Sequence, residues 1–366
     1  MPTRFVPSRT PALVVDRTAL DANLSAMQSL SDAAGMRLRP HGKMHKCTTL
    51  GRLQIARGAV GLCAQTVGEA EAFVAGGIPD VLVTSPSAAW AAPRIAALAR
   101  AARIGITADH ADQIAWLSEA ARHAGVTLDL VVDVDPGNHR TGVDPDGAVA
   151  LARAAAQAGG LRFAGIQMYA GHIQHVEDRD TRKRAYDDVL ARAASIVRAL
   201  TEAGLPPGVV TGGGTGSHAF DLASGVFTEL QAGSYAFMDV EYAACDAPGG
   251  GSWPFRQALW VVASVVSANH ASQVTVDAGI KAMSTDGPPA RVSGGAPAGS
   301  TWRPMGDEHG FIVLPDRSPD APRLGSLVWL QPGHCDPTVN LYDAMYVVAG
   351  DGSSERWRID ARRVTP

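Results

Sequence analysis

Short runs rich in β-branched residues alternate with longer Ala-rich segments of helical periodicity between residues 36 and 240. Such alternation is typical of repeated strand-helix units that build a parallel sheet. Eight such runs can be separated, which is the number that a (β/α)8 barrel requires. The predicted strands span residues 36–40, 60–65, 80–84, 103–107, 128–134, 162–169, 208–211 and 227–231. The chain is therefore predicted to be an α/β protein built on a TIM-like barrel.

The pattern changes after about residue 256. Short alternating segments are separated there by Gly, Pro and Asp turns, and there is almost no helical periodicity. This pattern is typical of a mostly antiparallel β domain. Residues 12–15 also have the pattern of an isolated strand, ahead of the barrel.

Composition argues against several classes of protein. The 366 residues carry a net charge of −4, and the basic residues form no stripe interleaved with aromatics, so no nucleic-acid partner is expected. No apolar run reaches the roughly 20 residues that a membrane-spanning helix needs. The N-terminal segment lacks the features of a signal peptide, and we expect a cytoplasmic protein. The 4 cysteines form no CxxC pair and are expected to be reduced thiols.

Candidate reactive side chains follow most of the predicted strands. In a (β/α)8 barrel the active site lies at the C-terminal ends of the strands, where all the strand-helix loops open. The polar residues just past the predicted strand ends are His41, Lys43, Gln65, Thr84, Asp109, Asp135, Arg140, Tyr169, His172, His175, Thr215 and Ser234. We therefore expect them to converge on one rim of the barrel.

The segment TGGGTGS, residues 211–217, follows the seventh predicted strand. Closely approaching backbone N–H groups and hydroxyls can hold a phosphate at this place in a barrel. The segment is not a Walker A loop, because no Lys-Ser or Lys-Thr pair completes it. The simple alternative is a glycine-rich turn, but Gly233 and Ser234 after the eighth strand favour a phosphate site.

Lys43 lies just past the first predicted strand, in the segment RPHGKMHK. We expect neighbouring cations and partial burial to lower the pKa of its amine, as Schiff-base formation requires. With a phosphate site in the same barrel mouth, this favours pyridoxal phosphate as the cofactor. Two alternatives stay open, because Lys43 could be a solvated surface charge and Lys46 could carry the cofactor instead.

The segment GHCDPTVNLYD, residues 333–343, is a candidate metal site. His334 and Asp336 alternate with Cys335, so on an extended segment both would point to one side. An imidazole and a carboxylate with open positions suit a divalent metal, with Mn2+ expected and Mg2+, Co2+ or Zn2+ compatible. The alternative is a hydrogen-bonded turn at the start of a strand.

Together these segments resemble a known family. The order RPHGKMHK, CAQ, GIQMY with a following histidine, TGGGTGS, ELQAGSYAFMD, VDAG, DEHG and GHCDPTVNLYD resembles the D-threonine aldolases and 3-hydroxy-D-aspartate aldolases. More distantly it resembles D-serine dehydratases and alanine racemases. The resemblance implies an alanine-racemase-like fold, with a barrel over residues 20–245 and a β domain formed by residues 1–19 and 246–366. It also implies a homodimer whose active sites lie near the subunit contact.

The resemblance implies roles for individual residues. They are Lys43, which carries pyridoxal phosphate, Arg140 facing the pyridine nitrogen, Tyr169 packing on the ring, His175 as the base, and His334 with Asp336 as metal ligands. The other cofactor-binding positions are Gln65, Thr211, Gly213, Gly214, Thr215, Gly233, Ser234 and Tyr235. The family usually has a small residue in place of His172 and a histidine in place of Tyr342. These departures leave open whether the substrate carries a methyl, carboxylate or aryl group on its β-carbon.

The implied activity is a pyridoxal-phosphate- and metal-dependent cleavage of β-hydroxy D-amino acids, of the D-threonine type, to glycine and an aldehyde. The alternative is a dehydratase of D-serine or D-3-hydroxyaspartate that gives a keto acid and ammonia. The dehydratases that resemble this chain have His-x-Cys in place of His-x-Asp, so the choice depends on Asp336 facing the metal. A non-catalytic pyridoxal phosphate carrier would lack the β domain and the His-x-Asp pair.

Overall fold

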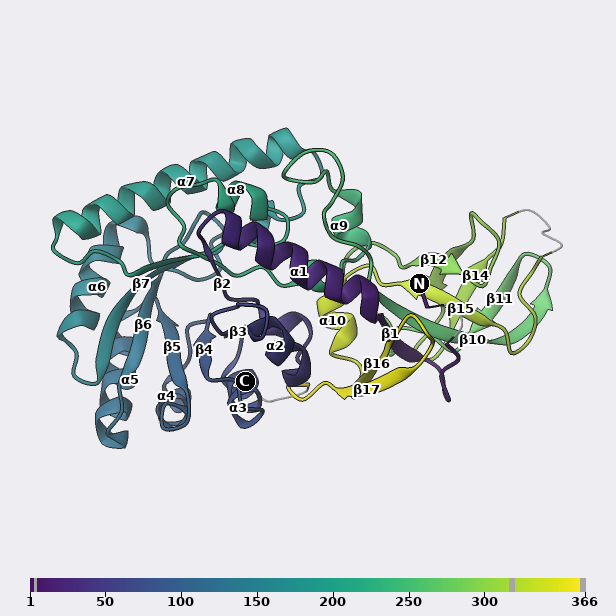
Figure 1. The fold of residues 1–366 in the computed structure, drawn as a ribbon, viewed down its shortest axis with the longest axis horizontal. Helices are drawn as coiled ribbons and strands as arrows, with labels where there is room; N and C mark the ends of the chain where they lie inside the picture. Colours follow the sequence, from purple (N-terminus) through teal and green to yellow (C-terminus); the bar gives the residue numbers. More distant parts are fainter. Residues whose placement is uncertain (3–4, 316–319, 363–366) are drawn as a thin grey trace.

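The computed structural model describes residues 1–2, 5–315 and 320–362, and it confirms the predicted barrel, which lies on the left of Figure 1. The barrel strands are β2 (Arg37–Leu38), β3 (Leu62–Ala64), β4 (Asp80–Val83), β5 (Arg103–Ala108), β6 (Leu128–Asp133), β7 (Leu161–Met168), β8 (Val209–Gly212) and β9 (Glu229–Leu230). They pair in parallel in the order β2-β9-β8-β7-β6-β5-β4-β3. A bridge between His41 and Cys63 closes the ring between β2 and β3.

Helices pack around the outside of the barrel (Figure 1). They are α1 (Arg17–Ala33), α2 (Thr48–Ile55), α3 (Val67–Ala75), α4 (Ala92–Leu98), α5 (Ala111–Ala124), α6 (Ala148–Gln157), α7 (Arg179–Glu202) and α8 (His218–Leu222). The short helix α9 (Val240–Ala244) lies between the barrel and the second sheet (Figure 1). Helix α5 shows why these segments are helical. Its buried residues Ile114, Leu117 and Ala121 recur every three or four positions, His110 caps its start, and Gly125 ends it in the left-handed conformation.

Short 3₁₀ helices occupy several of the loops. They are η1 (Gly42–Met44), η2 (Ala89–Ala91), η3 (Pro145–Gly147), η4 (Gly171–Ile173) and η5 (Ser234–Ala236). Helices η1, η4 and η5 follow the C-terminal ends of β2, β7 and β9. They carry Lys43, His172 and Ser234, so predicted site residues lie on short, hydrogen-bonded turns.

The second sheet forms the right-hand part of Figure 1. Its elements are β1 (Ala12–Asp16), β10 (Leu259–His270), β11 (Gln273–Val276), β12 (Arg291–Gly294), β13 (Thr301–Pro304), β14 (Gly310–Val313), β15 (Leu327–Gln331), β16 (Ala344–Val348) and β17 (Ser354–Arg358). The pairing is antiparallel except between β1 and β16. Strand β1 lies between β10 and β16, so the N-terminal strand belongs to the same sheet as the C-terminal strands. The boundaries at residues 20 and 245 stay a prediction.

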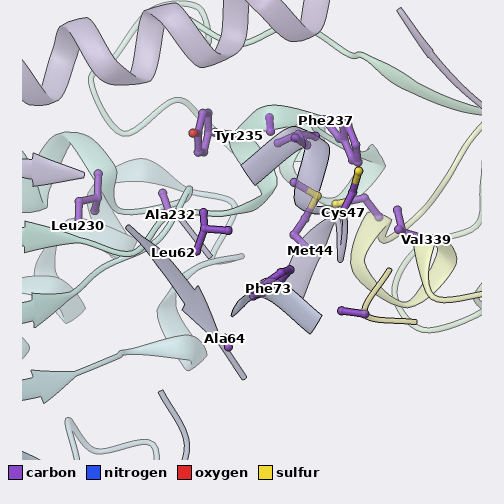
Figure 2. Packing of buried hydrophobic residues seen from close by; sticks show 14 of the residues in the cluster. Met44, Cys47, Leu62, Ala64, Phe73, Leu230, Ala232, Tyr235, Phe237 and Val339 are labelled. Carbon is purple, nitrogen blue, oxygen red and sulfur yellow. The ribbon is translucent and has the colours of Figure 1, made fainter. Parts of the chain in front are cut away.

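The helix α10 (Cys335–Val339) joins the C-terminal region to the barrel. Figure 2 shows Val339 of α10 near Met44 and Cys47, which follow the first barrel strand. All three side chains are buried in one hydrophobic cluster. This packing holds α10 against η1 and thereby brings the His-x-Asp segment to the mouth of the barrel.

Two expectations from composition can be compared with the structure. None of the described helices is long and apolar enough to cross a bilayer. All four cysteines are buried free thiols, which confirms that they are not paired in disulfides.

A buried ion-pair network joins three barrel strands, and disrupting it is expected to destabilise the protein. The Arg39 guanidinium donates to Glu229 at 3.0 Å and to Asp80 at 2.7 Å. Replacing Arg39 with Met leaves the buried Glu229 carboxylate with the more distant Arg37, at 4.0 Å, as its charged partner. The substitution should lower the free energy of unfolding by about 3 to 5 kcal/mol. Urea unfolding followed by circular dichroism would measure the loss. The exposed Arg303 offers a control, since Arg303→Met should change it by less than about 0.5 kcal/mol. Equal effects of the two substitutions would contradict the expectation.

Candidate active site

A cavity of about 440 Å³ lies at the C-terminal ends of the barrel strands, where the loops carrying η1, η4 and η5 meet α10. Its volume lies within the range of cofactor and ligand sites. Predicted site residues that line the cavity are Lys43, Gln65, Arg140, Tyr169, His175, Gly214, Thr215, Gly233, Ser234, His334 and Asp336. The structure therefore brings together the loops that follow the barrel strands and the start of α10, which are widely separated parts of the chain.

Three predicted cofactor-binding residues lie behind this lining, not on it. Thr211 is buried in the barrel, where its hydroxyl donates to Glu229 at 3.1 Å. The Tyr235 hydroxyl accepts a hydrogen bond from a buried glutamine, and the Tyr235 N–H donates to Thr215 Oγ1 at 2.9 Å. Gly213 has a φ of 70°, and a Cβ there would lie 2.3 Å from Asp221. The geometry thus gives these residues supporting positions around the glycine-rich segment.

Lys43 lies against the carboxylate of Asp336, with 2.8 Å between Lys43 Nζ and Asp336 Oδ2. The negative charge of Asp336 raises the pKa of Lys43 well above its usual value, against the effect of burial. The expectation that neighbouring cations lower this pKa is therefore wrong, because the carboxylate is the closest charge. Lys46, the alternative, forms an ion pair with Glu69 and does not line the cavity. The geometry favours Lys43 as the cofactor lysine.

The cavity wall on the side of β8 and β9 suits a phosphate. Gly214, Thr215, Gly233 and Ser234 line it, so two hydroxyl groups and the backbone of two glycines border the cavity. A Cβ on Gly233 would lie 3.1 Å from the backbone oxygen of His41, so glycine allows this loop to pack closely against the loop that carries Lys43. These residues fit the phosphate of pyridoxal phosphate.

Arg140 and Tyr169 form another part of the lining. The Arg140 guanidinium lies 5.7 Å from the centre of the Tyr169 ring, within the range of a cation-π contact. The loop before Arg140 is shaped by Asp135, whose Oδ1 accepts the N–H groups of Gly137 and Asn138 at 2.9 Å and 2.8 Å. Asp135 lies just past the end of β6, as predicted, but it shapes this loop and does not line the cavity. A ring held here would have an arginine at its edge and an aromatic face beside it.

The predicted metal pair lies at a helix start and not on an extended segment. His334 is the N-cap of α10 and Asp336 lies in its first turn, so the expected strand-like alternation is wrong. Both side chains nevertheless line the cavity. Cys335 is buried beside them, and its N–H donates to Asp239 Oδ2 at 3.0 Å, which anchors the helix start to the segment before α9.

The donor set at His334 and Asp336 is compatible with a divalent metal. Burial alone would raise the pKa of Asp336, but Lys43 and His334 lower it strongly, so the carboxylate is ionised. His334 Nδ1 lies 3.0 Å from Asp286 Oδ2, a pairing that orients an imidazole and leaves Nε2 for a ligand. No group of three or more His, Cys, Asp or Glu side chains in the described part of the chain is arranged to hold a metal. The pair would thus give an open site completed by water or substrate.

His175 lies in the same part of the cavity. Its Nδ1 is 3.5 Å from Glu241 Oε1, and its ring makes a tilted contact with Tyr242, with 4.4 Å between the ring centres and 56° between the ring planes. Burial, with help from the nearby His334, lowers the pKa of His175 to about 4, so the imidazole is neutral at pH 7. Its buried Nε2 has no hydrogen-bond partner within the described residues. Such an orphaned atom is a candidate proton acceptor for a substrate.

The two positions that depart from the family pattern differ in their placement. His172 lines the cavity and is exposed, so it can contact a substrate. Tyr342 does not line the cavity, and its hydroxyl donates to the backbone oxygen of Ala282 at 2.7 Å. Of the two departures, His172 therefore lies at the cavity and Tyr342 lies outside its lining.

Sequence reasoning missed several polar residues of the lining. Gln167 and Gln231 line the barrel interior, where Gln231 Nε2 donates to Gln167 Oε1 at 3.0 Å. Asn138 and Tyr242 also line the cavity. A signal was available for the glutamines, because each is a polar residue near the C-terminal end of a predicted strand.

Comparisons with known proteins show which family the chain belongs to. Residues 15–241 match the family model "Alanine racemase, N-terminal domain", and residues 258–348 match "Putative serine dehydratase domain". The chain is 42% identical to a D-threonine aldolase of Arthrobacter sp, over 96% of this chain and 92% of that one. It is also 42% identical to a 3-hydroxy-D-aspartate aldolase of Paracoccus denitrificans, over 97% and 92%.

The chain belongs to the D-threonine aldolase family. A crystal structure of D-threonine aldolase from Filomicrobium marinum superposes with a TM-score of 0.93 at 42% identity, over 97% of this chain and 96% of that one. A D-threo-3-hydroxyaspartate dehydratase variant in the metal-free form superposes with a TM-score of 0.84 at 28% identity, over 96% and 97%. Among these family relatives, the aldolases, which are lyases, are thus more similar in sequence than the dehydratase.

Proposed function

We propose that this member of the D-threonine aldolase family cleaves β-hydroxy D-amino acids to glycine and an aldehyde, using pyridoxal phosphate and a divalent metal. The observation that carries the proposal is the contact between Lys43 and Asp336. It places the candidate cofactor lysine and the candidate metal ligand at one point, in a cavity that His175 also lines. A substrate attached near Lys43 would therefore have its β-carbon close to a metal and a base.

The residues on the barrel side would hold and orient the cofactor. Lys43 would bind it covalently, while Gly214, Thr215 and Ser234 would hold its phosphate. Pyridoxal phosphate supplies an electron-accepting ring conjugated to the substrate α-carbon. Arg140 has only N–H donors that it does not give up, so a pyridine nitrogen facing it stays unprotonated. An unprotonated ring accepts electrons from the α-carbon less strongly. It therefore suits a reaction in which deprotonation of the β-hydroxyl provides much of the driving force.

The residues on the α10 side would act on the β-hydroxyl. His334 and Asp336 would hold the metal, which supplies a Lewis acid at this position. His175 is neutral at pH 7 and has an unpartnered Nε2, so it can accept the hydroxyl proton. Glu241, next to Nδ1, would stabilise the resulting imidazolium.

The dehydratase alternative is less well supported by the metal segment. Cys335, which has the middle position, is fully buried, and burial raises the pKa of its thiol well above the usual value. Asp336 is the residue of this segment that contacts Lys43 in the cavity. A hard carboxylate suits a metal that keeps an oxygen ligand bound, as cleavage of the carbon-carbon bond needs.

The proposal also covers the metal, the oligomeric state and the cellular location of the enzyme. We propose Mn2+ as the metal, because an imidazole and a carboxylate with open positions suit it. We also propose a homodimer with its active sites near the subunit contact, which rests on the resemblance to the family. Four unpaired cysteines support a cytoplasmic location, where thiols stay reduced.

The proposal is tested by product analysis. The protein loaded with Mn2+ and pyridoxal phosphate is incubated with D-threonine, D-3-hydroxyaspartate and L-threonine, and glycine, aldehyde, keto acid and ammonia are assayed in parallel. We expect equal amounts of glycine and aldehyde from a D-substrate and none from L-threonine. Formation of keto acid and ammonia in place of glycine would reject the aldolase assignment.

A further inference from the structure

A buried glutamine links the glycine-rich segment to the segment that carries His175. Gln174 precedes His175 in the sequence and has only 1% of its surface exposed. Its Oε1 accepts the N–H of Gly216 at 3.0 Å. Its Nε2 donates to Ser217 Oγ at 3.0 Å and to the backbone oxygen of Ala170 at 3.3 Å. One side-chain amide therefore bonds to both segments.

The hydrogen bonds continue beneath the glycine-rich segment. Ser217 Oγ accepts the N–H of Gly214 at 3.1 Å and donates to Asp221 Oδ2 at 2.7 Å. With the bond from Gln174, this hydroxyl makes one donor and two acceptor contacts, which is its full capacity. The conformation of the segment is thus fixed by side chains that lie outside the cavity.

Steric contact adds to the hydrogen bonds. A Cβ on Gly214 would lie 2.4 Å from Gln174 Oε1, and a Cβ on Gly216 would lie 2.0 Å from the Gln174 backbone oxygen. Real Cβ atoms do not approach other atoms so closely, so neither position tolerates a side chain without movement. These two glycines are therefore required by the segment of Gln174, whatever the cavity binds.

We propose that Gln174 is a positioning residue that couples the binding of pyridoxal phosphate to the placement of His175. The inference rests on the proposed function, because it takes residues 214 and 215 as part of the phosphate site and His175 as the base. A phosphate at Gly214 and Thr215 stabilises the conformation of the segment that Gln174 and Ser217 maintain. The same amide fixes the backbone next to His175, so ordering one segment orders the other.

The variant Gln174→Met tests this coupling, because Met fills a similar volume without donating a hydrogen bond. Cofactor-stripped full-length protein is titrated with pyridoxal phosphate by visible absorbance. Amide hydrogen exchange of peptides covering residues 170–178 is measured with and without the cofactor. We expect the Kd for pyridoxal phosphate to rise about tenfold, since buried partners lose their hydrogen bonds. The protection of residues 170–178 that the cofactor confers on the wild type should be lost.

Two further variants sharpen the test. Gln28→Met removes a buried amide from α1, away from the cavity, and should leave both readouts unchanged. Ser217→Ala removes the partner of Gln174 and should reproduce both effects, which keeps the test decisive if Gln174→Met fails to fold. An unchanged Kd and full cofactor-dependent protection in either Gln174→Met or Ser217→Ala would overturn the coupling alone. A wild-type protein that develops no visible absorbance with pyridoxal phosphate would overturn the proposed function and the coupling together.

Discussion

Replacing Lys43 with Ala is expected to remove the visible absorbance of bound pyridoxal phosphate and to abolish turnover. Among the described residues, Lys43 is the one lysine that lines the cavity. The candidate phosphate-binding residues and the predicted metal pair line the same cavity. Loss of a covalently acting group that works as part of a unit should lower kcat by roughly 10⁴-fold or more. Absorbance spectra of the protein after dialysis against pyridoxal phosphate would measure the first effect, and a glycine assay the second.

Lys46→Ala is the matched control for this substitution. Lys46 is three residues further along the chain, but its amine pairs with Glu69, which also accepts the N–H of Gln65 at 2.7 Å. The variant should therefore keep the absorbance, even if its stability falls. Persistence of the absorbance in Lys43→Ala, with its loss in Lys46→Ala, would show that the cofactor lysine is wrongly assigned.

Removal of the metal is expected to stop turnover while leaving the cofactor bound. His334 and Asp336 belong to the α10 segment, whereas Gly214 and Thr215 of the phosphate wall belong to the loop after β8. A Lewis acid contributes several kcal/mol to stabilising a developing charge, so chelation should lower kcat by roughly 10³-fold. Activity and absorbance are measured after exhaustive dialysis against EDTA, and again after Mn2+ is added back.

Substitution of the ligands should give the same pattern as chelation. His334→Ala should be inactive with or without Mn2+ and should retain the visible absorbance. Asp307→Asn changes an exposed acid that pairs with Lys281 away from the cavity, and it should behave as the wild type. Full activity after exhaustive chelation would remove the metal from the mechanism.

The barrel could be predicted from the sequence because the hydrophobic pattern of each strand and helix is contained in a short segment of the chain. Each strand is a short buried run and each helix an amphipathic segment, so periodicity alone separates them. The placement of reactive residues at one rim then follows from the parallel arrangement of the strands. This is why Lys43 and Thr215, far apart in the sequence, could be assigned to one site before their contacts were known.

Other features depend on contacts that no local pattern contains. The pKa of Lys43 is raised by Asp336, which lies 293 positions away, so counting the neighbouring cations in the sequence gave the wrong direction. The start of α10 is fixed by Asp239, which accepts the N–H of Cys335 across 96 positions. Without this anchor, the alternation of polar residues around Cys335 is equally compatible with a strand.

The role of Gln174 illustrates the same limit at shorter range. In the sequence it is a single polar residue next to His175, and nothing marks it for attention. Its importance lies in hydrogen bonds to Gly216 and Ser217, which are 42 and 43 positions away. Only the folded barrel, which places the loop after β7 beside the loop after β8, reveals the contact.

The most direct test of the central claim is the reaction with D-threonine in D2O, followed by mass spectrometry of the products. Cleavage of the bond between the α- and β-carbons leaves an α-carbon that takes one deuteron from solvent. The account therefore predicts acetaldehyde and singly deuterated glycine in equal amounts. Removal of the α-proton and loss of the β-hydroxyl would instead give ammonia and 2-oxobutyrate labelled at C3. That second outcome would contradict the aldolase assignment, while the fold, Lys43 and the metal pair would stand.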